Sequence, residues 1–219
     1  MIGILIPAHN EEDLLEPCIR AALRAGCHQQ LEGEPVMVLV VLDSCTDRSA
    51  QIVAQYPVHS LEIEARNVGE ARAAGARYLL EQGARWISCS DADSLVSKDW
   101  LVAQLALGAD AVCGTVTVDQ WHADFDEPAQ IRYHQHYQAR DGHRHIHGAN
   151  LGISAEAYQR AGGFEPLACD EDVQLVRQLE LCGANIAWSH QPQVLTSARL
   201  DSRARGGFGD FLRNMVQVE

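Results

Sequence analysis

Continuous apolar runs alternate with stretches of helical spacing through the first half of this chain. The apolar runs predict four strands, at residues 2–6, 36–42, 61–63 and 86–90. The stretches between them predict three helices, at residues 14–25, 49–55 and 71–80. Strands that are apolar throughout, rather than alternating, are typical of a parallel sheet with helices on both faces. The pattern therefore predicts an α/β fold, a Rossmann-like βαβαβαβ arrangement with a mostly parallel sheet flanked by helices.

The second half of the chain has a looser pattern. It predicts a helix at 98–107, a strand at 111–118, a short strand within 148–154 and helices at 155–161 and 170–181. A polar segment that carries several histidines, at 120–147, lies between them. No internal repeat or linker divides the chain, so we expect a single domain with a smaller second half.

Composition and charge narrow the class of protein. The chain has 219 residues, of which 47% are hydrophobic and 21% charged, and no apolar run approaches the ~20 residues that span a bilayer. The first residues run directly into Pro7 without a basic leader, which predicts a strand rather than a signal peptide and favours a cytoplasmic protein. A net charge of −13 would repel a phosphate backbone, so we expect no binding to nucleic acid.

The seven cysteines include no C-x-x-C pair, and their number is odd. This spacing argues against a disulfide framework and against a zinc ribbon. We therefore expect reduced thiols, most of them buried.

Polar clusters follow each of the four predicted strands. They are Asn10 and Glu11 after the first strand, Asp43 after the second, Arg66 and Asn67 after the third, and Asp91 and Asp93 after the fourth. Right-handed crossovers place the carboxyl ends of parallel strands at one edge of the sheet, where ligands of such folds bind. We therefore expect the four clusters to meet in one site.

Asp91 and Asp93 carry the clearest chemistry in the sequence. Side chains two apart on an extended backbone point to the same side, so the two carboxylates are predicted to converge. Hard divalent ions bind oxygen ligands, and Mg²⁺ is commonly held by one or two carboxylates together with substrate phosphates. The pair therefore indicates a metal-diphosphate site, with Arg66 and Arg72 as candidate diphosphate ligands. A solvated turn is the alternative, because Asp also favours the ends of strands.

Five motifs in this order and spacing resemble those of the GT-A glycosyltransferases of family 2. They are Pro7–Glu11 for P-x-x-N-E, Leu42–Asp47 for D-D-x-S-x-D, Asp91–Asp93 for D-x-D, Gly148–Asn150 with Ala161–Phe164 for the segment before the catalytic base, and Glu171–Leu175 for E-D-x-x-L. The resemblance implies a GT-A fold and the inverting transfer of a sugar, of the hexosyltransferase class, from a nucleotide-diphosphate donor. It also implies a nucleotide-binding half at 1–93 and an acceptor half at 94–195. The polar, glycine-ended segment that follows predicts a flexible flap and helix at 196–219, with a flexible, solvated C-terminus as the alternative.

The resemblance implies roles for single residues. Asp172 is the expected base that accepts the proton of the acceptor hydroxyl, and Asp93 is the expected ligand of Mg²⁺ or Mn²⁺. Asp91 is expected to contact the ribose or to share the metal. The residues expected to bind the donor, a UDP- or GDP-linked sugar, are Pro7, Ala8, Asn10, Glu11, Asp43, Arg66, Asn67, Asp91, Ala92, Arg199 and Arg205.

Histidines supply a further set of candidate metal ligands, His143, His145, His147 and His190. A dedicated zinc site would require more ligands at suitable distances, and the carboxylate pair favours Mg²⁺ or Mn²⁺. We therefore expect His190 as an additional ligand of the catalytic metal and most of the other histidines in a surface loop.

This chain departs from the family pattern in two places, which bear on the identity of the donor and on the number of sugars added. Leu42 stands where the family has the first of two aspartates, which leaves the identity of the donor base open. The chain ends at Glu219 without the Q-x-x-R-W motif or the membrane helices of processive synthases, so we expect a single addition. The sequence leaves the acceptor open among a glycan, a lipid-linked compound, a small metabolite and a protein. Peripheral contact with a membrane and a homodimer are both compatible with the sequence.

Two other classes of function are alternatives. A noncatalytic nucleotide-sugar binder would keep the contacts at the sheet edge but lose the base or the metal acid, and this chain has both. A sugar nucleotidyltransferase commonly has a glycine-rich loop with basic residues after the first strand, whereas this chain has His9, Asn10 and Glu11 there. A structural role at the start of a helix is also an alternative for Glu11, Asp170 and Glu171, because acidic side chains are favourable in the first turn.

Overall fold

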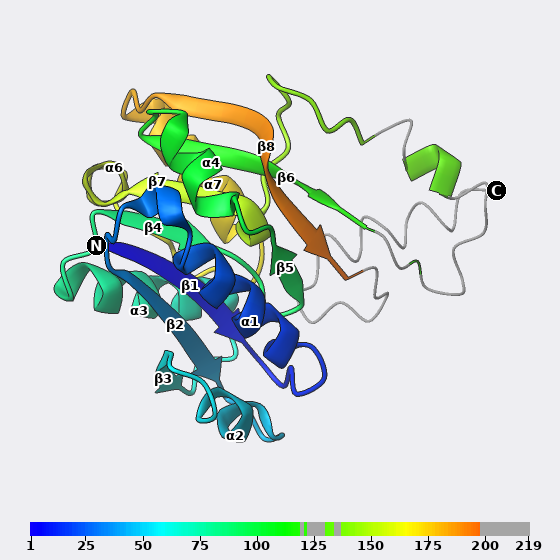
Figure 1. The fold of residues 1–219 in the computed structure, drawn as a ribbon. Coiled ribbons are helices and arrows are strands. Elements are labelled where there is room, and N and C mark those ends of the chain that lie inside the picture. Colours follow the sequence, from blue (N-terminus) through cyan, green and yellow to red (C-terminus); the bar gives the residue numbers. More distant parts are fainter. Residues whose placement is uncertain (119–120, 122–129, 134–136, 198–219) are drawn as a thin grey trace.

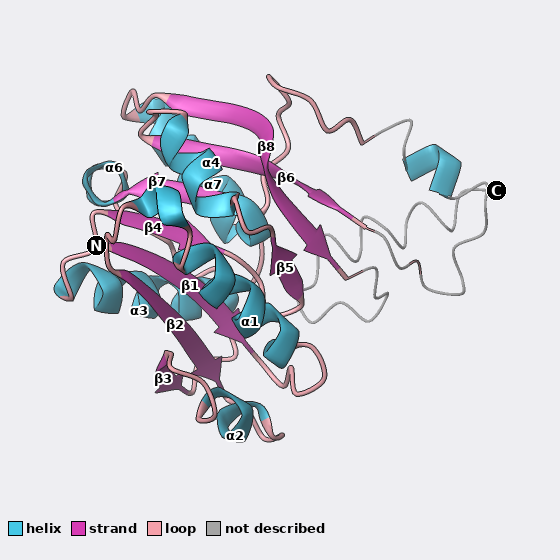
Figure 2. Ribbon diagram, viewed as in Figure 1, coloured by secondary structure: helices cyan, strands magenta, loops and turns pink. Residues whose placement is uncertain are grey.

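The computed structural model describes residues 1–118, 121, 130–133 and 137–197. Within these residues the strands of one sheet lie in the order β3-β2-β1-β4-β7-β6-β8-β5 (Figures 1 and 2). The strands are β1 Ile2–Ala8, β2 Val36–Asp43, β3 His59–Ile63, β4 Trp86–Cys89, β5 Ser94–Val96, β6 Ala111–Thr117, β7 Leu151–Ser154 and β8 Ile186–Thr196. The helices are α1 Leu15–Gly26, α2 Ser49–Val53, α3 Val68–Glu81, α4 Trp100–Ala106, α6 Ala155–Arg160 and α7 Glu171–Leu181, with 3-10 turns at Gln29–Leu31 and Gly148–Asn150.

The first half of the sheet is parallel, and this confirms the predicted βαβ arrangement. Strand β1 pairs with β2 on one side and with β4 on the other, and β3 pairs with β2. The register places Ile2 opposite both Val36 and Trp86. The carboxyl ends of these four strands therefore lie along one edge of the sheet, termed the carboxyl edge below.

The second half of the sheet is mixed. Strand β7 runs antiparallel to β4 and β6, β8 runs parallel to β6, and β5 runs antiparallel to β8. Neither β5 nor β8 was predicted from the sequence. Strand β8 contains Pro192 and polar residues, and its pairing with β6 shifts register between Gly114 and Thr115. Because proline cannot donate a ladder hydrogen bond, such a stretch has the pattern of a loop, and a three-residue strand gives no periodic signal.

Helices cover both faces of the sheet and form two separate apolar cores. Helices α1, α2 and α4 pack on one face, and α3, α6 and α7 pack on the other (Figure 1). Successive side chains of a strand point to opposite faces, so Val38 and Val40 belong to one core and Leu39 and Val41 to the other. Both faces are apolar, which is why the strands are apolar without alternation. Among the described residues, no helix combines the length and the apolar character needed to cross a membrane.

Helix α3 packs close to the sheet. Gly75 lies against Leu5 and Val41, and a Cβ atom at this position would clash with both side chains. The side chain of Asn67 accepts a hydrogen bond from the backbone N–H of Glu70 at 3.0 Å and so caps the helix. The cap and the glycine together fix the first turns of α3 at the carboxyl edge.

Candidate active site

Left-handed backbone conformations are concentrated next to the predicted site residues. Asn10, Ser44, Arg66 and Asp170 have φ angles of 54°, 52°, 51° and 59°. Among the described residues, Glu32 is the one other non-glycine residue with positive φ. Non-glycine residues adopt this region rarely, and such residues cluster at functional sites.

Asn10 connects the loops that follow β1 and β2. Its Oδ1 accepts hydrogen bonds from the backbone N–H of Thr46 at 2.7 Å and of Asp47 at 3.3 Å. The Nδ1 of His9 lies 2.6 Å from the backbone carbonyl of Asp43, to which it donates. Asn10, predicted as a donor contact, therefore also holds the two loops together.

The other residues of the first motif lie in the same place. Ala8 is buried beside the half-buried Pro7, and its carbonyl accepts a hydrogen bond from Cys45 Sγ at 3.3 Å. Glu11 is buried, and its backbone N–H donates to Ser49 Oγ at 2.9 Å. The P-x-x-N-E segment is thus fixed against the loop after β2 and the start of α2.

Asp43 binds the backbone of the loop that follows β3. Its Oδ1 accepts from the N–H groups of Ala65 and Arg66, and its Oδ2 accepts from that of Asn67, each at 2.8 Å. Burial of Asp43 favours the neutral acid, but these N–H donors outweigh burial and hold the pKa of its carboxyl below the usual range. Asp43 therefore positions Arg66 and Asn67, and backbone donors bind both of its carboxylate oxygens.

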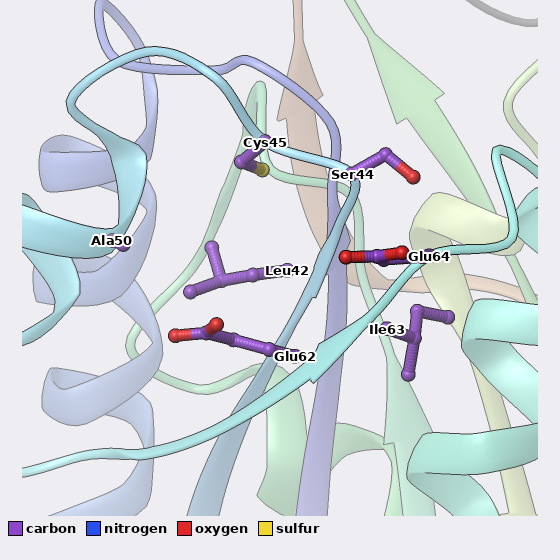
Figure 3. A pocket seen from close by; sticks show the side chains of 7 residues that line it. All are labelled: Leu42, Ser44, Cys45, Ala50, Glu62, Ile63 and Glu64. Atoms are coloured by element: carbon purple, nitrogen blue, oxygen red, sulfur yellow. The ribbon is translucent and has the colours of Figure 1, made fainter.

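An open pocket of about 210 Å³ lies beside this loop, at the ends of β2 and β3 and next to α2 (Figure 3). Its lining residues are Leu42, Ser44, Cys45, Ala50, Glu62, Ile63 and Glu64. Leu42 contributes apolar surface where the resembling motif has an acid. The carboxylates of this lining come instead from Glu62 and Glu64 of the β3 segment.

The D-x-D segment follows β4 directly, and its two carboxylates have different surroundings. Asp91 Oδ1 accepts a hydrogen bond from Arg72 Nη2 at 2.5 Å. Ala92 is buried. Asp93 is half-buried, and its Oδ1 accepts from Ser94 Oγ, the first residue of β5, at 3.3 Å. The structure therefore places Asp91 in an ion pair with the helix α3 and Asp93 next to β5.

Arg72 lies inside the protein, and the prediction that it contacts a diphosphate is wrong. The residue is 1% exposed, and its Nε donates to Glu171 Oε1 at 2.9 Å. Together with the bond to Asp91, this contact joins α3, the D-x-D segment and α7. A diphosphate arriving from solvent does not reach a guanidinium that is buried to this extent.

Asp172 lies in the first turn of α7, next to the partner of Arg72. Its Oδ2 accepts from the backbone N–H of Gly148 at 2.6 Å, and its Oδ1 accepts from that of Val173 at 2.7 Å. Burial raises the pKa of Asp172 above the usual carboxyl range, and the positive charge of Arg72 opposes part of that rise. Burial raises the pKa of Glu171 in the same way, again opposed by Arg72.

The structure places His190, at the bulge of β8, beside Asp141. His190 Nδ1 lies 2.9 Å from Asp141 Oδ1. In the register of β5 and β8, Ser94 pairs with Thr196, and His190 lies six residues before that pair along β8. Residues 190–192 lie in a bulge of β8, because Gly114 pairs with Ser189 and the next residue, Thr115, pairs with Gln193. The role of His190 as a ligand to a metal at Asp93 stays a prediction.

The other three histidines lie in a loop, as expected, but their rings form a stacked, partly buried row. The ring centroids of His143 and His145 are 5.4 Å apart, those of His145 and His147 are 6.1 Å apart, and Tyr137 stacks on His145 at 4.2 Å. Burial lowers the pKa of His147 to about 3, so this imidazole is neutral at physiological pH. In the described part of the chain, no group of three His, Cys, Asp or Glu side chains is arranged to hold a metal ion.

Within the Gly148–Asn150 motif, the side chain of Asn150 has a structural role that was not predicted from the sequence. Asn150 is fully buried, and its Nδ2 donates to the carbonyls of Thr115 at 2.7 Å and Pro192 at 2.9 Å. Its Oδ1 accepts from Trp100 Nε1 at 2.8 Å. This side chain therefore joins β6, β8 and α4 beside the acids of α7. The predicted donor contacts Arg199 and Arg205 lie outside the described residues.

A family model described as "Glycosyl transferase family 2" matches residues 3–161. No curated protein matches the sequence.

Solved structures of glycosyltransferases have a similar fold. Residues 1–349 of S. aureus TarS in complex with UDP-GlcNAc give a TM-score of 0.68 at 14% identity, over 98% of this chain and 65% of that one. The mannosyltransferase PcManGT from Pyrobaculum calidifontis, in complex with GDP-Man and Mn²⁺, gives 0.68 at 16% identity, over 92% and 58%. GalNAc-T7 with UDP, GalNAc and Mn²⁺ gives 0.69 at 14% identity, over 100% and 48%. The chain thus spans less than two thirds of each of these three proteins.

Proposed function

Because this chain belongs to glycosyl transferase family 2, we propose that it transfers one sugar from a nucleotide-diphosphate donor to a hydroxyl acceptor, with inversion and with a divalent cation. One observation carries the proposal. Arg72 binds Asp91 of the D-x-D segment and Glu171 of the E-D-x-x-L segment, next to Asp172. Motifs that are eighty residues apart in the sequence therefore meet around the buried Arg72 at the carboxyl edge.

The donor is proposed to lie along the carboxyl edge. Its base would occupy the pocket at the ends of β2 and β3 (Figure 3), and its diphosphate would lie near Asp93 after β4. Strands are about 4.8 Å apart, so the two or three steps from the pocket to β4 correspond to about 10–15 Å. An extended nucleoside diphosphate suits this spacing. Since the similar structures hold UDP-GlcNAc or GDP-Man, both classes of donor are candidates.

The residues of the D-x-D segment fit a hard divalent cation. Carboxylate oxygens are the donor type that Mg²⁺ and Mn²⁺ prefer, and a metal held mainly by a diphosphate and water requires few protein ligands. Asp93 would be the principal protein ligand, because Asp91 already binds Arg72. When bound, the ion supplies positive charge that neutralises the leaving diphosphate. PcManGT and GalNAc-T7, which have a similar fold, were both solved with Mn²⁺.

Asp172 is proposed as the general base. The acceptor oxygen forms a bond to the anomeric carbon while the bond from that carbon to the diphosphate oxygen breaks, and the hydroxyl proton passes to the Asp172 carboxylate. A single displacement of this kind inverts the anomeric centre. Burial raises the pKa of Asp172, which brings its basicity closer to the working pH and favours proton transfer. The N–H groups of Gly148 and Val173 hold the carboxylate in place.

A product assay tests the proposal against its two alternatives. The protein is incubated with UDP- and GDP-linked sugars, Mn²⁺, and glycan, lipid-linked or small hydroxyl acceptors. Release of nucleoside diphosphate, with an acceptor-dependent increase, supports a glycosyltransferase. Pyrophosphate exchange would instead identify a nucleotidyltransferase, and saturable binding without turnover of any donor would identify a nucleotide-sugar binder. The anomeric configuration of the product, read by NMR coupling constants, tests inversion.

A further inference from the structure

Arg72 connects two parts of the proposed active site through different nitrogen atoms of one guanidinium. Nη2 binds Asp91, and Nε binds Glu171 at 2.9 Å. Asp91 belongs to the D-x-D segment, and Glu171 directly precedes Asp172. The planar guanidinium has a fixed fork of donors, so these two bonds fix the position of one segment relative to the other.

Two of the charged side chains that form these contacts are buried, and an unpaired charge there would be destabilising. Arg72 is 1% exposed and Glu171 is 6% exposed. An unpaired charge at such depth is strongly destabilising, whereas apolar pairs often replace buried ion pairs at little loss of stability. The stability of the fold therefore does not by itself explain an arginine at this position. Its placement between two acid-bearing segments indicates a role in their geometry.

The loop that holds Asp172 also touches Arg72. The N–H of Gly148 donates to Asp172 Oδ2, and a Cβ atom at Gly148 would clash with the Arg72 guanidinium. The residue at 148 must therefore be glycine for Arg72 and Asp172 to keep their present positions. Arg72, Gly148 and Asp172 are packed as one unit.

We propose that Arg72 is a positioning residue that fixes the D-x-D segment relative to Asp172, and that the two-pronged geometry of arginine is required for this. The assignment of Asp172 as the base is part of the proposed function, so the effect on catalysis rests on that function. The positional claim rests on the contacts alone. Lysine at 72 carries one nitrogen on a flexible stem and does not bind both acids in the same geometry.

The first test measures position without using activity. The backbone amides of Gly148 and Val173 both donate to Asp172, so their hydrogen exchange reports whether this carboxylate stays in place. In Arg72→Lys we expect exchange at both amides to accelerate at least ~10-fold, while the amide of Ile4 in the central strand β1 is unchanged. The matched control is Arg85→Lys, since Arg85 binds Glu34 with two nitrogens at 2.7 and 2.6 Å and lies outside the cluster.

Two results of the exchange experiment would overturn the proposal. Unchanged exchange at Gly148 and Val173 would show that Arg72 does not hold the Asp172 carboxylate. Equal acceleration at Ile4 would show that Arg72 acts only on overall stability. If Arg72→Lys does not fold, Glu171→Gln replaces it, because glutamine keeps the shape and an acceptor oxygen for Nε but loses the charge. Selective acceleration at Gly148 and Val173 in that variant supports the proposal by the same criterion.

The second test asks whether the positioning matters for catalysis. We expect Arg72→Lys to reduce kcat at least ~100-fold with a much smaller change in KM, and to have little further effect in an Asp172→Asn background. If the two substitutions instead reduced kcat by independent factors that multiply in the double variant, Arg72 would not act through Asp172. That result would overturn the catalytic part of the proposal. A wild-type protein that turns over no donor would refute the proposed function, and the exchange experiment would still decide the positional claim.

Discussion

At the scale of single residues, the surroundings of a side chain decide its role more than its type does. Arg66 and Arg72 are six positions apart, and both follow a strand that ends at the carboxyl edge. Arg66 is exposed and has a left-handed backbone conformation, whereas Arg72 is buried between two acids. Asp91 and Asp93 differ in the same way, because one binds this buried arginine and the other lies next to β5.

Replacement of Asp172 by asparagine tests the base directly. Asparagine has nearly the same shape but does not accept the proton of the acceptor hydroxyl, so we expect kcat to fall at least ~100-fold. The dissociation constant of the donor should change little, because Asp172 is not among the proposed donor contacts. Steady-state kinetics and calorimetric titration with nucleoside diphosphate measure the two quantities. Asp170→Asn is the matched control, and a near-normal rate in Asp172→Asn would remove this residue from the role.

The pH dependence of the rate follows from the raised pKa of Asp172. A base acts in its ionised form, so kcat should fall as the pH decreases through the pKa of Asp172 in the folded protein. Burial raises that pKa, opposed by Arg72, and the acidic limb should therefore lie above the usual carboxyl range. A pH-rate profile at saturating donor and metal measures it. The limb should be absent from the residual activity of Asp172→Asn, and its persistence there would assign it to another group.

At the scale of elements, the strand-end loops are organised by side chains that bind backbone. Asn10 joins the first loop to the second, and Asp43 joins the second to the third. Asn150 does the same for β6, β8 and α4. Residues that the sequence motifs identify as ligand contacts thus also bind backbone donors and acceptors of the neighbouring loops and strands, which stabilises the fold.

Asp43→Asn tests the element-scale role. The carboxylate of Asp43 accepts from three backbone N–H groups, and an amide nitrogen in its place would oppose at least one of them. We expect the free energy of unfolding to decrease by about 2 kcal/mol, the scale for hydrogen bonds to a charged acceptor. Urea denaturation at neutral pH measures it. Glu62→Gln on exposed β3 is the control and should change stability by less than about 0.5 kcal/mol.

The lowered pKa of Asp43 determines how its contribution to the free energy of unfolding depends on pH. A carboxyl group that is more acidic when folded stabilises the protein above its ordinary pKa, and this contribution is lost as the pH falls through the lowered value. The stability difference between wild type and Asp43→Asn should therefore shrink in acid. A difference that stays constant down to strongly acidic pH would contradict the charge-assisted role.

At the scale of the whole molecule, a parallel half and a mixed half of one sheet meet between β4 and β7. The D-x-D segment follows β4, and the Gly148–Asn150 turn leads into β7, its neighbour in the sheet. The proposed donor side and acceptor side therefore meet at the change of strand direction. Helix α7 then adds Glu171 and Asp172 to this junction through the contact with Arg72.

Binding of the donor should stabilise the whole molecule when a metal is present. A ligand at 100 times its dissociation constant adds about 2.7 kcal/mol to the free energy of unfolding, which raises the melting temperature. We expect this shift for GDP or UDP with Mn²⁺ and a much smaller one when EDTA removes the metal. In Asp93→Ala the Mn²⁺-dependent part should disappear, while Asp99→Ala serves as an acid-to-alanine control. An unchanged Mn²⁺ effect in Asp93→Ala would exclude this residue as the principal metal ligand.

The order of the amino acids was sufficient to predict the parallel half of the fold and the residues at the carboxyl edge. Apolar runs and turn residues are local signals, so β1 to β4 and the loops after them follow from the order of residues. The three-dimensional structure was needed to reveal β5 and β8, the buried position of Arg72 and the contact of His190 with Asp141. These depend on contacts between distant residues, such as Arg72 with Glu171 ninety-nine positions away. Burial and pairing are properties of such contacts, and no local pattern of residues encodes them.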